Sequence, residues 1–241
     1  MMKRATTAVG TSPKHSPSIT AVPFGVGPPM LRLSGRDREH LATIATPMRV
    51  DTGTILFRRG EEAHSLYSIV FGTMCTYREG SDGSRRVLAF LFTGDLTGLA
   101  RRGVYVNTVK AITPTSLFRF PMETLTALLT RDAGLQFRFL CKTTHLLRET
   151  QRQAIMITRQ DPVERVAMFL SQLEEAQGDT PGNAPILLPM TRQDIADYLN
   201  LPVKAITPAL AALEQRHMIK RKPDGSVVVV DRRRFDALVS G

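Results

Sequence analysis

The spacing of the apolar residues changes near residue 121, and no other feature of the sequence constrains the fold as strongly. Before that point, short apolar runs are separated by glycine-containing turns. Turn signals that recur roughly every 8 to 12 residues are typical of an all-β roll or barrel, and residues 81–84 form a hairpin signal. The expected strands are Thr54 to Phe57, Leu66 to Phe71, Met74 to Tyr77, Val87 to Phe92, Val104 to Val109 and Ser116 to Phe120.

From about 122 to 158 the apolar residues recur instead at three- and four-residue steps, which predicts helix. The part from 135 to 157 is long and apolar on one side, and its stripe approximates a heptad. A parallel helix pair between two subunits is the natural use of such a stripe, and a helix packed only on its own roll is the alternative. The expected seam consists of Phe139, Leu140, Leu146, Leu147, Ala154 and Ile157.

A helix-turn-helix signal follows in the last third of the chain. Asp161 and Pro162 are suited to the cap and first position of a new helix, which marks a domain hinge. Further along, Thr191 and Asp194 have the spacing of a capping box, and Asn200 suits the left-handed backbone of a tight turn. A second helix should follow Asn200. After it, residues 218–222 and 227–230 flank the turn residues 223–225 and should form a hairpin that serves as the wing.

Composition narrows the class of protein. The chain has 241 residues, 42% of them hydrophobic, which is enough for two globular domains. It contains no apolar run of roughly 18 to 20 residues and no signal peptide, so we expect no membrane partner and a cytoplasmic protein. Cys75 and Cys141 are far apart and indicate buried thiols rather than a disulfide or a metal site. No nucleophile, carboxylate pair or metal spacing indicates an enzyme, and no cofactor is expected.

The net charge of +10 favours an anionic partner, and nucleic acid is the first candidate. The charge is unevenly placed, because residues 161–200 are mainly acidic and residues 201–241 mainly basic. Residues 1–30 are rich in Thr, Ser, Pro and Gly and should form a disordered, solubilising arm. Contacts of Lys3, Arg4 and Lys14 with phosphate are the alternative use of that arm.

The chain resembles the Crp/Fnr family of transcription regulators, especially its Fnr and FixK branches, over about residues 48–235. The resemblance implies an α+β chain: a disordered arm (1–30), a cyclic-nucleotide-binding-type β-roll sensor (31–121), a dimerisation helix region (122–158) and a winged helix-turn-helix (159–241). It also implies a homodimer that reads a palindromic site and contacts RNA polymerase. The residues that carry it are Gly53, Gly60, Glu61, Gly72, Gly83, Gly94 to Leu99, Asp161 to Ala167, Met190 to Leu199, Leu213, Glu214, Met218 and Ile219.

The resemblance also places an effector pocket, whose candidate residues are Gly94, Asp95, Gly98, Leu99, Arg101 and Arg102. Cyclic-nucleotide binders of the family have a glutamate at the position of Asp95 and an Arg-Ser pair near the positions of Tyr105 and Val106. Because the phosphate clamp is missing, we expect no response to cAMP, although Arg101 or Arg102 could swing inward.

Other sensing modes of the family find little support. Iron–sulfur members have cysteines near the N-terminus, and this chain has none before Cys75. A haem would need an axial ligand, for which His64, Met74, Cys75 and His145 are conceivable. The resemblance to the FixK branch favours a regulator that needs no small ligand, with activity set by expression, oxidation or proteolysis.

The second helix of the helix-turn-helix, which enters the DNA groove in this family, differs in sequence from the family pattern. Fnr-type readers carry Glu-Thr-(Val or Ile)-Ser-Arg where this chain has residues 204–208, Lys-Ala-Ile-Thr-Pro. An altered operator specificity is therefore expected. Pro208 either lies in the second turn of the helix or makes it start late. The alternative is a sensor or partner-binding dimer without specific DNA binding. The candidate DNA contacts are Thr191, Arg192, Gln193, Lys204, Thr207, Ala211, Lys220, Arg221 and Lys222.

Overall fold

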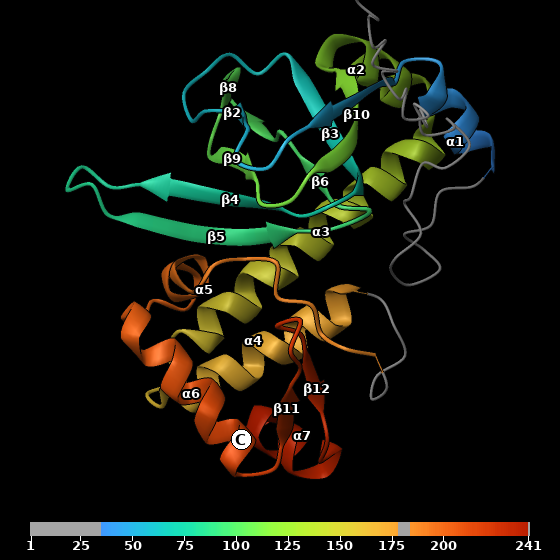
Figure 1. The fold of residues 1–241 in the computed structure, drawn as a ribbon. Helices are drawn as coiled ribbons and strands as arrows, with labels where there is room; N and C mark the ends of the chain where they lie inside the picture. Colours follow the sequence, from blue (N-terminus) through green and yellow to red (C-terminus); the bar gives the residue numbers. More distant parts are fainter. Residues whose placement is uncertain (1–34, 178–183, 241) are drawn as a thin grey trace, which may run out of the picture.

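The computed structural model describes residues 35–177 and 184–240, apart from the side chains of His145 and Leu146. The expected arm over residues 1–30 lies outside this range. The described chain has an N-terminal β-roll, a long connecting helix and a C-terminal unit built mainly of helices (Figure 1). No described helix is long and apolar enough to cross a membrane.

The β-roll follows a short helix, α1 (Gly35–Ala42), and contains two antiparallel four-stranded sheets. One has the order β1-β10-β3-β6 and the other β2-β9-β4-β5. Side chains from both sheets meet in one apolar core, with Ile69, Met74 and Leu117 fully buried. The strands are β1 (Thr46–Val50), β2 (Ile55–Phe57), β3 (Ser65–Phe71), β4 (Met74–Glu79), β5 (Arg85–Leu91), β6 (Leu96–Thr97), β7 (Ala100–Arg101), β8 (Val104–Tyr105), β9 (Thr108–Ala111) and β10 (Thr115–Pro121).

The six strands predicted from the sequence are present, but the observed pattern differs from the prediction in two ways. Strands β1, β6 and β7 were not expected, and the run from Val104 to Val109 is two strands, β8 and β9, rather than one. The chain bends at residues 106 and 107, so that β8 pairs with β7 while β9 pairs with β2 and β4. Gly72, between β3 and β4, has a φ of 98°, and a Cβ there would lie 2.6 Å from the carbonyl oxygen of Pro114. Only glycine fits this turn.

Two helices connect the roll to the C-terminal unit. Helix α2 (Met122–Arg131) ends at Asp132, and α3 (Ala133–Met156) begins directly after it. The Asp132 carboxylate accepts a hydrogen bond of 2.9 Å from the backbone N–H of Leu135, which caps α3. The predicted helical stretch is thus two helices, because Asp132 offers the backbone a cap in place of a continuous helix. Helix α3 runs along the roll and down to the C-terminal unit (Figure 1).

The C-terminal unit has the predicted helix-turn-helix and wing. It contains α4 (Pro162–Gln177), α5 (Arg192–Leu199), α6 (Val203–Gln215), the strands β11 (Ile219–Arg221) and β12 (Val227–Val229), and α7 (Arg232–Ser240). Helix α4 begins as expected, with the Asp161 carboxylate accepting from the N–H of Val163 at 2.8 Å. The core of the unit is formed by Phe169, Leu170, Leu199, Leu213, Phe235 and their neighbours.

The β-roll and the C-terminal unit share one apolar cluster. The hairpin of β4 and β5 lies over α5 (Figure 1), and Tyr77 and Val87 of the hairpin pack in the same cluster as Phe169 and Tyr198. The ring of Phe90 lies 5.2 Å from that of Tyr198 and 5.9 Å from that of Phe169. This contact between the two units was not predicted from the sequence.

Candidate nucleic-acid interface and sensor cavity

Helix α5 is fixed at both ends by local hydrogen bonds. The Thr191 hydroxyl accepts from the N–H of Asp194 at 3.1 Å, and the Asp194 carboxylate accepts from the N–H of Thr191 at 3.0 Å. This is the predicted capping box. At the other end Asn200 adopts φ 53° and ψ 48°, the left-handed conformation that was expected there. The chain turns at Asn200 and enters α6.

Helix α6 is held by packing rather than by a cap. It begins at Val203 after Pro202, without a side-chain cap, and Pro208 lies in its interior. The possibility that the helix starts late, at Thr207 and Pro208, is therefore wrong. Ile206, Leu210 and Leu213 are buried in the core, and this burial keeps the helix in place although Pro208 cannot donate to the carbonyl of Lys204. The opposite face carries Lys204, Thr207 and Pro208, all exposed.

The wing brings further cations beside α5. Arg192, Arg221 and Lys222 line one shallow cleft between the start of α5 and the β11–β12 hairpin. Burial and the positive charge of Arg221 lower the pKa of Arg192. The Glu214 carboxylate holds Arg221 by accepting from its backbone N–H at 3.0 Å and its Nε at 2.8 Å. Glu214 also lines the cleft and offsets the charge of Arg221, but three cations against one carboxylate leave an excess of positive charge that favours binding of an anion.

The remaining candidate DNA contacts differ in how free they are. Lys220 and Lys222 are exposed, as Lys204 and Thr207 are, whereas Ala211 is half-buried. The Thr191 hydroxyl is occupied in the capping box, and the Gln193 amide donates to Asp197 at 2.6 Å.

The sequence reasoning missed Arg85. This residue begins β5, and its guanidinium donates to the Asp194 carboxylate at 2.6 Å and lies 3.6 Å from Asp197. It also lies 4.5 Å from the centre of the Tyr77 ring and donates to Cys75 Sγ at 3.3 Å. Arg85 therefore joins the β-roll to the capping box of α5. Asp194 is 109 residues away in sequence, so no local signal could have indicated the pair.

Cys75 and Cys141 are both free thiols. Cys75 is buried as expected, and burial raises the pKa of its thiol. Cys141 is only half-buried, unlike the buried thiol that was expected.

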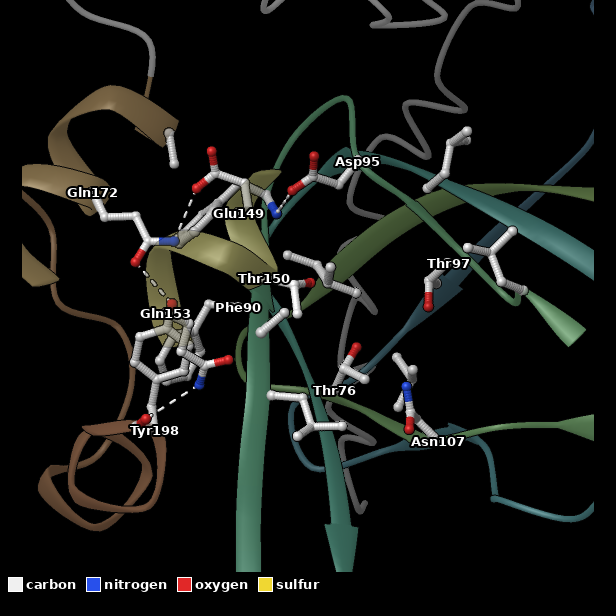
Figure 2. A pocket seen from close by; sticks show the side chains of 18 of the residues that line it. Thr76, Phe90, Asp95, Thr97, Asn107, Glu149, Thr150, Gln153, Gln172 and Tyr198 are labelled. Atoms are coloured by element: carbon white, nitrogen blue, oxygen red, sulfur yellow. Dashed lines mark hydrogen bonds between the residues drawn. The ribbon is translucent and has the colours of Figure 1, made fainter. Parts of the chain in front are cut away.

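A cavity of about 700 Å³ opens where the roll, α3 and the C-terminal unit meet. Figure 2 shows Thr76 and Phe90 from the hairpin, Glu149 and Gln153 from α3 and Tyr198 from α5 around it. Its wall on the helical side is a chain of hydrogen bonds. The Tyr198 hydroxyl donates to Gln172 Oε1 at 2.8 Å, and Gln172 Nε2 donates to Glu149 at 2.9 Å.

The chain matches two family models. A model of the cyclic nucleotide-binding domain covers residues 47–132, and a model of the Crp-like helix-turn-helix domain covers residues 164–238. The transcriptional activatory protein AadR of Rhodopseudomonas palustris is 30% identical over 86% of this chain and 87% of its own length. The chain belongs to the Crp/Fnr family.

A second relative and a solved structure support the assignment of this chain to the Crp/Fnr family. The nitrogen fixation regulation protein FixK of Rhizobium meliloti is 32% identical over 75% of the chain and 83% of its own length. The solved structure of FixK2 from Bradyrhizobium japonicum superposes with a TM-score of 0.75 and 27% identity, and covers 81% of this chain and 97% of that one. The resemblance inferred from the sequence is confirmed. The chain is a DNA-binding transcription regulator, and its relatives are regulators rather than enzymes.

The Crp/Fnr cavity includes only part of the expected effector site. Asp95, Gly98 and Leu99 line it, whereas Gly94 does not. Arg101 and Arg102 are exposed on β7 and the following turn and do not line it, so neither has swung inward.

The family's phosphate-clamp positions are apolar or occupied here. Val106 lines the cavity. Tyr105 is buried, and its hydroxyl donates to the carbonyl of Ser65 at 2.9 Å; burial raises the pKa of Tyr105 to about 12. A cyclic phosphate would therefore meet no arginine at these positions.

The conceivable haem ligands do not converge on the cavity. Met74 is buried in the roll core, His64 is exposed beside Glu62, and Cys75 contacts Arg85. None of these three residues lines the cavity, and the side chain of His145 lies outside the described residues. The geometry does not favour a haem site.

The expected dimer seam is divided between two faces of α3. Leu140 and Leu147 are each 59% exposed and Ala154 is exposed, but Phe139 is buried against its own roll. Phe139 therefore does not belong to an exposed seam, because its side chain packs in the core of its own roll with Leu135. Ile157 is half-buried at the end of α3, and the side chain of Leu146 lies outside the described residues.

Proposed function

We propose that this Crp/Fnr regulator acts as a homodimer, binds palindromic promoter DNA with a specificity unlike that of Fnr, and contacts RNA polymerase. The observation that supports the altered specificity most directly is the exposed face of α6. Lys204, Thr207 and Pro208 occupy it. Lysine replaces an acceptor for cytosine with a donor suited to guanine or phosphate, and proline removes a bidentate guanine contact worth about 1 to 3 kcal/mol.

The cations beside α6 support backbone binding. Lys204, Lys220 and Lys222 are exposed, and none of them forms an ion pair among the residues that the structure describes. Together with the cleft lined by Arg192 and Arg221, they give the C-terminal unit, called the reading unit below, a surface suited to phosphate. In this arrangement Lys204 and Thr207 would read bases, while the wing residues would hold the DNA backbone.

Selection of bound sequences from a random DNA pool tests this specificity. We expect the wild type to enrich a palindrome that differs from the Fnr-type site, and the Lys204→Glu, Pro208→Arg variant to shift towards the Fnr-type half-site. Enrichment of the Fnr-type palindrome by the wild type, or the same motif from both proteins, would contradict the proposal. Lys222→Ala is the matched backbone variant: its motif should stay unchanged while the salt slope of binding falls by about one.

The exposed stripe of α3 supports the homodimer. Phe137, Leu140, Leu147 and Ile155 are each more than half exposed, although they are large and apolar. Phe137, Leu140 and Leu147 fit heptad positions that continue through Thr144, Gln151 and Ala154, with alternating steps of three and four residues. A second copy of α3 would bury this stripe. It would also place two reading units on one duplex, as the palindrome requires.

Sedimentation at micromolar concentration tests the seam. Leu140→Glu with Leu147→Glu should give a monomer, because the charges would be buried without partners in the helix pair. The control is Thr124→Glu with Ala127→Glu on the exposed face of α2, which should remain dimeric. A dimeric seam variant would refute this interface.

A further inference from the structure

The cavity at the junction of the two units extends beyond the effector pocket that the sequence predicted. Besides the roll and α3, its lining includes Phe169, Gln172, Leu173, Glu175 and Ala176 of α4 and Tyr198 of α5. At about 700 Å³ it lies within the range of small-molecule sites, roughly 300 to 1,000 Å³. A molecule in this cavity would contact the sensor and the DNA-reading unit at the same time.

Most of the cavity wall is apolar. Phe57, Leu91 and Val109 of the roll core line it and are each no more than 5% exposed. Nearer the opening the lining side chains are half-buried or exposed, so an occupant could cover them. These are Leu88, Phe90, Phe92, Leu99 and Val106. Burial of such a surface favours a hydrocarbon or aromatic body.

The charged groups inside the cavity already neutralise one another. Lys142 is 5% exposed, and its Nζ lies 3.8 Å from Asp95. Asp95 also accepts from the N–H of Phe92 at 2.9 Å. On the other wall, Arg152 forms ion pairs with both Glu149 and Glu175. An anionic ligand would have to displace one of these carboxylates, which disfavours it.

Two arginines at the edge do not change this balance. Arg78 is exposed, and its Nε donates to Asn107 at 2.8 Å. Arg148 is exposed on α3, so water screens its charge. The other polar side chains that line the cavity are neutral. They include the hydroxyls of Thr76, Thr93, Thr97 and Thr150 and the amides of Asn107, Gln153 and Gln172, most of which are labelled in Figure 2. Such groups orient a ligand without demanding a charge on it.

We propose that this cavity binds a small uncharged, mainly apolar molecule, and that the bound molecule raises DNA affinity by bridging the sensor to the reading unit. The helical wall supplies the connection. Gln153 Nε2 donates to the carbonyls of Val87 in β5 and Tyr198 in α5, at 3.2 Å each. Lys204 and Thr207 stay exposed in this arrangement, so an occupant that stabilises it favours DNA binding.

The cavity face of α3 is distinct from the seam. Lys142, Glu149 and Gln153 are separated by seven and four residues and therefore share one side of the helix. At about 100° per residue, Leu140 and Leu147 lie on nearly the opposite side. A partner helix on the seam would leave this wall of the cavity free.

Fluorescence titration of the full chain with N-phenyl-1-naphthylamine, an uncharged apolar probe, tests the site. We expect saturable binding of one probe per chain, and at least tenfold weaker binding by Val106→Trp. The matched control is Val104→Trp, two residues away and outside the cavity lining, which should bind as the wild type does. Equal binding by the two variants would overturn the site.

A second pair of variants tests the wall formed by the reading unit. Ala176→Trp on α4 should also weaken probe binding, whereas Ser171→Trp, half-buried on α4 but not part of the lining, should not. Loss of binding with Val106→Trp but not with Ala176→Trp would confine the site to the roll and defeat the two-unit proposal. The pair also serves if Val106→Trp fails to fold.

Charge selectivity tests the ligand class. The anionic probe 8-anilino-1-naphthalenesulfonate has a similar aromatic body and should bind at least tenfold more weakly than the neutral probe. Millimolar cAMP should not displace the neutral probe. Tighter binding of the sulfonate, or displacement by cAMP, would refute an uncharged ligand.

The effect on DNA rests on the proposed function, whereas probe binding does not. Saturating neutral probe should tighten binding to the selected palindrome at least fivefold in the wild type and leave Val106→Trp unchanged. Unchanged affinity in the wild type would overturn the coupling. A chain that binds the probe but no DNA would instead defeat the proposed function and leave the site standing.

Discussion

The two helices of the helix-turn-helix are stabilised in different ways. Helix α5 has eight residues, a complete capping box, a left-handed residue at its end and a sensor arginine on its cap. Helix α6 has 13 residues, no side-chain cap and an internal proline. The helix that would read DNA is thus the one with fewer local stabilising features. Its position depends on Ile206, Leu210 and Leu213, which anchor it in the core.

This difference shows that local helix signals and functional position need not coincide. Helix α5 is specified by its own sequence and then tied to the sensor through Asp194. Helix α6 is specified by the spacing of its buried residues, because packing outweighs a defect in the backbone ladder. Changes at the cap and changes at the proline should therefore have separable effects.

The largest expected effect is at Pro208. Replacing it with alanine restores an N–H that can donate to the carbonyl of Lys204, and should raise the free energy of unfolding by about 3 kcal/mol. Urea denaturation measures this change. Pro202→Ala is the control, since Pro202 precedes the helix, and it should change stability far less. Equal effects at the two positions would show that the hydrogen bond missing at Pro208 does not destabilise α6.

Next in size is Arg85. Arg85→Glu removes the partner of Asp194 and adds a like charge, and should lower the free energy of unfolding by about 2 kcal/mol. The figure is below that for a fully buried pair because the Arg85 side chain is 27% exposed. Arg86→Glu introduces the same charge at an exposed neighbour and should have little effect. Similar losses from both variants would show that the ion pair between Arg85 and Asp194 does not contribute to stability.

Thr191 should have a smaller effect. Thr191→Ala removes the hydroxyl that accepts from the N–H of Asp194, and should cost about 1 kcal/mol in urea denaturation. Thr191→Ser keeps the hydroxyl and should be close to the wild type. If alanine and serine behave alike, the cap contributes nothing to α5.

The smallest effect is a dependence on pH. Burial raises the pKa of Asp194, but hydrogen bonds from Thr191 and Arg85 outweigh it, so this pKa lies below its ordinary value. The carboxylate therefore stabilises the fold above the unfolded pKa of about 3.9, and the stabilisation is lost as pH falls through the folded value. The stability difference between wild type and Asp194→Asn should be constant from pH 7 to 5 and shrink below pH 4. A difference that is as large at pH 3 as at pH 7 would exclude this titration.

The sequence by itself determined the elements whose signals are short in range. Capping at Thr191, the left-handed turn at Asn200 and the strand and helix periods depend on atoms within a few residues of one another, so the pattern of residue types is sufficient. The wing was predicted in the same way, because the turn residues Pro223 and Gly225 lie between two short segments, 218–222 and 227–230. The sequence did not decide the orientation of α3. Its apolar residues cover two faces of the helix, and their spacing does not show which face packs on its own roll.

Only the tertiary structure decided which residues of the β-roll contact which residues of the C-terminal unit. The pairing of Arg85 with Asp194, and the meeting of Val106, Gln153 and Tyr198 around one cavity, join residues from separate elements far apart in the chain. The sequence around a charged or apolar residue is the same whether its side chain faces water or contacts a distant helix. Its partner is therefore set by how the packed units dock, a property that no window of the sequence contains.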